Sequence, residues 1–130
     1  MYDEVLQAVI DMAEMAVGVS IVTGSMPPEN GIAMTGSASS YPIFLDIGSN
    51  ESMNVVCNGK NVSQQEVINQ LDAIHKFLTR RKNYPTGNGW QIYAIETVSS
   101  PRLLGREQNS QWLYGSSLTV KFNVGGITTE

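Results

Sequence analysis

The sequence is short of cysteine, histidine and charge, and each shortage excludes a class of protein. Because Cys57 is the only cysteine, no disulfide can form within the chain, which fits a reducing cytosol. Cys57 lies in an apolar run with no adjacent basic residue, so we expect a buried and unreactive thiol. The net charge is −4, which argues against a protein that binds nucleic acid by neutralising phosphates.

Signatures of catalysis and of membrane insertion are also lacking. His75 is the only histidine, and neither a second imidazole nor a cysteine stands at metal-ligand spacing from it. The glycines form no dinucleotide fingerprint and no P-loop, and there is no nucleophile elbow. No apolar run approaches the ~18 residues of a membrane span. We therefore expect no enzyme, no metal and no cofactor, with His75 as the only plausible proton shuttle.

What remains is a chain for one ordinary domain. Its 130 residues, 42% of them hydrophobic, can bury a core, and we expect a single α+β domain over residues 1–124 with a short flexible C-terminal tail at 125–130. Charged residues make up 15% of the chain, compared with about a quarter in typical domains. Such a surface suits a protein pressed against neighbours, and equally a neutral monomer.

Two segments carry helical patterns. Residues 2–17 place apolar side chains at three- and four-residue steps, with acid in the first turn and Gly18 as the stop. The second segment begins with a capping box, in which Ser63 and Glu66 each serve a free amide of the other. Its apolar stripe comprises Val67, Leu71, Ile74 and Leu78. We expect Arg80, Arg81 and Lys82 to lie in its last turn as a cationic cap; a contact with an acidic partner surface is the alternative.

The first half of the chain also contains short strand candidates. Residues 19–23, 31–37 and 53–57 are the segments that we expect to be strands. Residues 26–31 contain two prolines and Asn-Gly, which predict a turn. Residues 41–47 are apolar but interrupted by a proline, so we interpret them as an edge segment or a packed loop.

The closing third of the chain carries the clearest strand pattern. Residues 112–124 alternate between apolar and polar side chains, which predicts a long strand with one packed face, and we expect an edge of it to be free for pairing. Residues 90–98 are apolar on both parities, which suits a more central strand. Between them, residues 99–110 predict a long linker that contains two arginines. A long ordered loop at the end of a sheet is a common place for function.

Two interpretations of this loop remain open. In the first, Arg102 or Arg106 pairs with Glu107 on the surface, and Leu103 and Leu104 plug the edge of the core. In the second, the guanidinium groups dock on a neighbouring protein, with one of the leucines as an apolar anchor. The candidate partner-binding residues are Arg102, Leu103, Leu104, Arg106, Glu107 and Trp112.

The same region resembles a known family. The segment from Pro101 to Ser116, with its sequel Trp112-Leu113-Tyr114-Gly115-Ser116, is similar to the signature of minor capsid or tail-terminator proteins of long-tailed phages of Gram-positive bacteria. Phe44-Leu45-Asp46 fits the same family. So does Gly59-Lys60-Asn61, which leads into a helix patterned Gln65, Leu71, Ile74 and Leu78. The resemblance spans about residues 26–124.

This resemblance and the residue patterns agree on two helices packed on a twisted, mostly antiparallel sheet. The resemblance implies a homo-oligomeric ring in the virion neck, expected to be a hexamer. Such a ring would cap the tail tube protein and receive the head connector or stopper protein, while DNA passes through its lumen without specific binding. We expect no membrane partner. A head-completion or stopper protein of the connector is the alternative, and a small cytosolic enzyme is a third.

Overall fold

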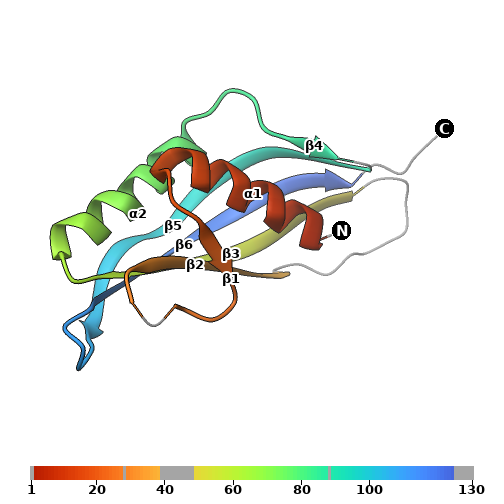
Figure 1. Cartoon of the computed structure of the whole chain (residues 1–130). Helices are drawn as coiled ribbons and strands as arrows, with labels where there is room; N and C mark the ends of the chain where they lie inside the picture. Colours follow the sequence, from red (N-terminus) through yellow and green to blue (C-terminus); the bar gives the residue numbers. More distant parts are fainter. Residues whose placement is uncertain (1, 28, 39–48, 88, 125–130) are drawn as a thin grey trace.

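The computed structural model describes residues 2–27, 29–38, 49–87 and 89–124, which form helices on one sheet (Figure 1). The elements are α1 (Tyr2–Val17), β1 (Ile21–Thr23), β2 (Gly31–Ala38), β3 (Ser49–Asn61), α2 (Gln64–Thr79), β4 (Thr86–Gly87), β5 (Trp90–Arg106) and β6 (Trp112–Val124). Two helices packed on one six-stranded sheet confirm the α+β class. The expected packed loop at 41–47 and the expected tail at 125–130 lie outside the described residues.

The strand order is β1-β2-β3-β6-β5-β4. The first pair, β1 with β2, is parallel, and the other pairings are antiparallel. Strand β6 pairs with β3 on one side and with β5 on the other along its whole length. The expectation that this strand offers a free edge is therefore wrong. The prediction that residues 90–98 form a more central strand is also wrong. These residues belong to β5, which has only the two-residue β4 on its far side.

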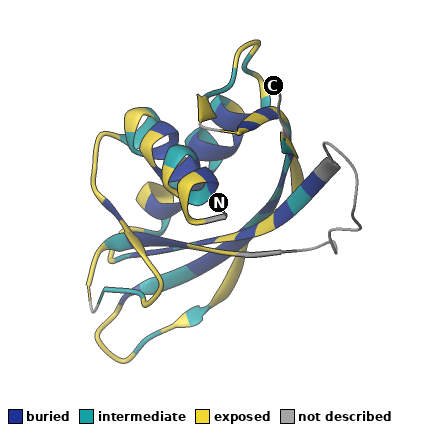
Figure 2. Ribbon diagram, turned by 90° about the vertical axis from the view of Figure 1, so that its right-hand side faces the viewer, coloured by how far each residue is buried: buried dark blue, intermediate teal, exposed yellow. Residues whose placement is uncertain are grey.

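Both helices cover the same face of the sheet. A Cβ added at Gly59 of β3 would meet Val67 and Leu71 of α2, and one at Gly36 of β2 would meet Leu6 of α1. Side chains of that parity form the core, including Met53, Val55, Leu118, Val120 and Phe122. Successive residues of a strand point to opposite faces, so their neighbours face away from the helices. Among the described elements, nothing covers that second face, as Figure 2 shows.

The predicted linker at 99–110 is mostly strand. Strand β5 continues to Arg106, and the turn to β6 occupies only residues 107–111. The pairing register shifts at four places along β5, so that extra residues repeatedly reset which face a side chain points to. These bulges remove the regular alternation that identifies a strand in sequence. One of them spans Ser100 and Pro101, which is where a strand tolerates a proline.

The helix ends follow the sequence in part. Helix α1 ends before Gly18, whose φ of 73° needs a residue without a Cβ, as expected. At the start of α2 the Ser63 hydroxyl accepts from Glu66 N at 3.2 Å, but the Ser63 N–H donates to Asn61 Oδ1 instead of to Glu66. The predicted capping box is therefore only half formed.

The basic run after α2 lies beyond the last turn, contrary to expectation. The helix ends at Thr79 with Arg80 as its C-cap, so the cation in the last turn is Lys76. The Arg81 guanidinium lies 4.7 Å from the centroid of the Phe77 ring and its Nε donates to Asn83 O. Neither described helix is long and apolar enough to cross a membrane.

The apolar stripe of α2 makes a direct test of the core possible. Leu71 is 0% exposed, and Leu71→Ala should lower the free energy of unfolding by about 2–5 kcal/mol, because it leaves a cavity under the sheet. Urea titration measures the change. Ser63→Ala is the matched control on the same helix and should cost about 1 kcal/mol through the lost cap. A loss below about 0.5 kcal/mol for Leu71→Ala would mean that the stripe is not core.

Candidate interaction site on the uncovered sheet face

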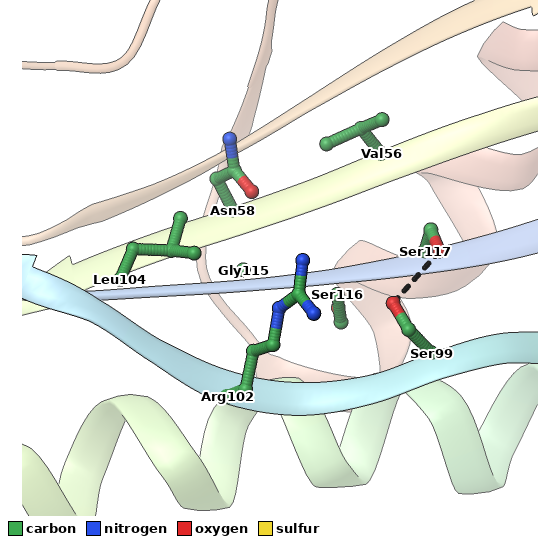
Figure 3. Close-up of a pocket in the computed structure, with 8 residues that line it drawn as sticks. All are labelled: Val56, Asn58, Ser99, Arg102, Leu104, Gly115, Ser116 and Ser117. Carbon is green, nitrogen blue, oxygen red and sulfur yellow. Dashed lines mark hydrogen bonds between the residues drawn. The ribbon is translucent and has the colours of Figure 1, made fainter.

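The uncovered face carries a hollow of about 320 Å³ over β6. Strand β3 forms one wall, β5 forms the other, and β6 forms the floor between them (Figure 3). The lining residues are Val56, Asn58, Ser99, Arg102, Leu104, Gly115, Ser116 and Ser117. The hydroxyls of Ser99 and Ser117 hydrogen-bond across the floor at 2.9 Å. The lining thus combines aliphatic side chains, small polar groups and one cation.

Among the described residues, the cation of the hollow has no partner. In Figure 3 the Arg102 side chain extends from β5 across β6, and within the described part of the chain no acceptor or carboxylate binds its guanidinium. Beside it, Leu104 is 49% exposed, and Val56 on the opposite wall is 42% exposed. A large aliphatic side chain left half in water is ordinary when isolated, but two of them beside an unpaired guanidinium mark a surface suited to binding.

Glycine at position 115 keeps the hollow open. A Cβ there would lie 2.7 Å from Leu104 Cδ1 and 2.8 Å from Asn58 Oδ1, so a larger residue would require the Leu104 and Asn58 side chains to move. Gly115 pairs with Asn58 on one side and with Arg102 on the other. Glycine inside a strand weakens it unless another group needs to approach closely. Here the groups that approach Gly115 closely are the Leu104 and Asn58 side chains, which line the hollow.

The six residues expected to bind a partner occupy four places. Arg102 and Leu104 line the hollow. Arg106 lies over the Trp112 ring, with 4.7 Å between the guanidinium carbon and the ring centroid. Leu103 pairs with Tyr114, whose parity is that of the helix-covered face, so Leu103 points away from the hollow. Because Leu103 is 50% exposed, it does not plug the core, and neither does Leu104.

Glu107 pairs with a lysine rather than with an arginine. Its carboxylate lies 2.8 Å from Lys60 Nζ, and the Lys60 side chain is only 6% exposed. This contact joins the β5–β6 turn to the end of β3. The expected ion pair between Glu107 and Arg102 or Arg106 is therefore wrong.

A second set of hydrogen bonds holds the same turn. Gln111 is 2% exposed, and its Oε1 accepts from Asn30 N at 2.8 Å. Asn30 Oδ1 in turn accepts from Val62 N at 3.1 Å. Within the turn, the Glu107 N–H donates to Gln111 O at 2.8 Å. The turn is thereby fixed to the segment before β2 and to the junction of β3 with α2.

Burial shifts the pKa of two titratable side chains in the core, Cys57 and His75. Burial raises the pKa of the Cys57 thiol to about 12, so the thiol stays protonated at neutral pH, as the sequence suggested. Burial also lowers the pKa of His75, against the opposing effect of Asp72. His75 Nδ1 lies 2.8 Å from Thr97 Oγ1, and its Nε2 has no partner among the described residues. Over the same residues, no three His, Cys, Asp or Glu side chains gather as a metal site would require.

Of the eight residues that line the hollow, the sequence analysis singled out Arg102 and Leu104. It missed Val56 in an apolar run, Asn58 beyond the expected strand at 53–57, and Ser117 on the polar parity of β6. The signal that could have located them was Gly115, a glycine inside an otherwise regular alternating strand. No local pattern predicted the contacts of Lys60 with Glu107 and of Gln111 with Asn30, because the partners lie far apart in the chain.

In comparisons with known proteins, no family model matches the chain and no curated protein matches it.

The ion pair between Lys60 and Glu107 predicts that removing both charges destabilises the fold less than removing Glu107 alone. Glu107→Ala should lower the free energy of unfolding by about 1–3 kcal/mol, because it leaves a buried ammonium without its acceptor. The double variant Lys60→Met with Glu107→Ala should be more stable than Glu107→Ala alone, since the uncompensated charge is gone. Thermal or urea unfolding measures both. If the double variant is the less stable of the two, the ammonium is solvated and the tie is a surface pair.

His75 predicts a pH dependence of stability. Because its folded pKa is lower than the unfolded value of 6.5, the unfolded chain binds the proton more readily. The contribution to stability is complete above that value and is lost as the pH falls from 6.5 toward the folded pKa, with a slope of at most about 1.4 kcal/mol per pH unit. Urea titrations between pH 7 and about 5.5, above the carboxylate range, measure the loss. His75→Gln should flatten this part of the profile; an unchanged slope would assign the dependence to another group.

Proposed function

We propose that the chain is a structural protein of the phage neck, a tail terminator. In this proposal it forms a homo-oligomeric, hexameric ring that caps the tail tube and provides the surface to which the head connector docks. Genomic DNA passes through the lumen of the ring. The role is mechanical and architectural rather than enzymatic, and its place is the virion, after assembly in the host cytoplasm.

The observation that carries the proposal is the uncovered sheet face. Sheets of small α+β domains bury one face under helices, and a second face that stays in water is normally polar. Here that face carries Val56, Leu104 and an unpaired Arg102 around one hollow. A subunit that docks against neighbours on that face would cover all three.

The segment that carries the family resemblance lies at the hollow, which supports the same proposal. The segment from Pro101 to Ser116 forms the distal half of the β5–β6 hairpin, one wall of the hollow and part of its floor. In Figure 1 this hairpin extends past α2 at one end of the molecule. A projecting hairpin held in place at its turn is a suitable contact element for a tube or a connector. Under this proposal the fold is tail-terminator-like in its finer features, including a twisted and mostly antiparallel sheet.

Tail length tests the role. In phage particles whose copy of this chain is removed by an amber mutation, the tail tubes should grow well beyond normal length, because only a terminator stops polymerisation. Electron microscopy of negatively stained particles measures the tubes. Supplying the intact chain in trans should restore normal tails. Tails of normal length that fail to join heads would contradict the terminator role and assign the chain to the stopper position.

The same complementation test can be directed at the hollow. Arg102→Glu should melt within about 1 °C of the wild type, because an exposed, unpaired cation contributes little to folding, yet it should fail to restore normal tails. Lys82→Glu, a charge reversal of the same size on an exposed cation beyond α2, is the matched control and should restore them. If Arg102→Glu complements fully, the hollow is not a docking surface.

A further inference from the structure

The chemistry of the hollow specifies its occupant. The Arg102 guanidinium is unpaired among the described residues, and the walls beside it present Leu104 and Val56. A guanidinium is preorganised for a carboxylate, and the half-exposed aliphatic groups gain from contact with an apolar side chain. The occupant should therefore carry a carboxylate with an exposed apolar side chain next to it.

Helix α1 of the chain itself presents that combination. Its exposed side includes Asp3, Gln7, Asp11 and Met15, which follow one another at four-residue steps. Met15 is 71% exposed, the most exposed of the large hydrophobic side chains that the structure describes. The four acidic residues of α1 are accompanied by no lysine or arginine. Two of them already serve the fold, since Glu4 accepts from Trp90 Nε1 and Glu14 accepts from Ile21 N.

The remaining carboxylate nearest to Met15 is Asp11, one helical turn away. Its only described contact is with Gln7 Nε2 at 2.9 Å, a neutral donor that leaves its charge uncompensated. The pair on α1 therefore matches the hollow in charge and polarity, with a carboxylate for the guanidinium and an apolar side chain for the aliphatic groups.

Helix α1 and the hollow lie on opposite sides of the sheet. Helix α1 belongs to the layer that covers the core face (Figure 2), whereas the hollow opens on the face turned away from that layer. One chain cannot bring these two surfaces together. Between copies, such a contact joins two different surfaces, so each copy still offers one of each, and the assembly closes into a ring or continues as a filament.

The outer edge of β5 is a less suitable route to assembly. Beyond Ile92, strand β5 pairs only with β6 among the described residues, so its outer edge could in principle accept another strand. Bulges along β5 interrupt that edge, and Pro101 removes one donor from it. Bulges and prolines are the features by which natural sheets prevent edge pairing. A contact between the uncovered sheet face of one copy and helix α1 of another avoids both obstacles.

We propose that α1 of a second copy of this chain seats in the hollow, with Met15 against Leu104 and Val56 and with Asp11 paired to Arg102. This contact rests on the proposed ring, because it names the surfaces through which neighbouring copies join. In this arrangement the acidic helix α1 of one copy faces the Arg102 guanidinium of the next.

Directed disulfide formation tests the contact with the purified full-length chain. The variants Met15→Cys and Leu104→Cys are mixed in equal amounts and oxidised gently, and non-reducing electrophoresis follows the mixed dimer. Its rate should exceed by about tenfold that of a mixture of Val62→Cys with Leu104→Cys, because docking raises the effective concentration of the two thiols. Val62 is 55% exposed and lies outside both surfaces, which makes it the matched control. The native Cys57 is buried and does not compete.

Charge reversal then tests the ion pair. Adding Arg102→Glu to the Leu104→Cys variant should slow the mixed dimer at least about tenfold, because the introduced carboxylate would face Asp11. Adding Asp11→Arg to the Met15→Cys variant should restore the rate. Equal rates for the Met15 and Val62 mixtures, or no restoration by the second reversal, would overturn the contact. This result is independent of tail length: abnormal tails with equal rates would leave the terminator role standing and reject only the α1 contact.

Discussion

The structure depends on the burial of one parity of β6 under the two helices. Leu118, Val120 and Phe122 are each 0% exposed, and the strand that carries them is paired on both sides along its whole length. With its backbone satisfied by β3 and β5 and its apolar parity covered by α2, β6 fixes the register of its neighbours, because a slip of one residue would turn every apolar side chain into water. The residues of β6 that point away from the helices form the floor of the hollow. The position of Gly115 among them is therefore fixed by the packing of the alternate β6 residues in the core.

Local patterns in the sequence were enough for the helices, for β6 and for the class of the fold. The apolar stripe through Leu71 and the stop at Gly18 lie where the sequence placed them, since both features depend on neighbours within one or two turns. Strand β5 could not be recognised beyond Val98, because its bulges reset the alternation that reveals a strand. The parallel pairing of β1 with β2 had no local signal either. Pairing partners and their direction are decided by the whole sheet.

The candidate site divides in the same way. The sequence singled out Arg102 and Leu104 from their unusual place in a polar stretch, and both line the hollow. It could not separate them from Leu103 and Arg106, because strand parity after a bulge is unknown until the pairing is known. It also assigned the wrong partner to Glu107: the nearest cations in the chain are Arg106 and Arg102, but the lysine at position 60 is the one that the turn brings to 2.8 Å. Proximity in sequence favours one ion pair, and the fold favours another.

The hydrogen bonds that hold the β5–β6 turn have a consequence for the thermodynamics of recognition. Gln111 and Glu107 connect the turn to two other parts of the chain, so the end of the hairpin is ordered before any partner arrives. Ordering a free loop on association costs conformational entropy, about 0.5–1.5 kcal/mol for each immobilised flexible side chain. A hairpin that has already lost that freedom on folding avoids this cost at the moment of contact. In the proposed ring, association through this hairpin should resemble the meeting of two rigid surfaces, with little change in backbone shape between the free and the assembled subunit.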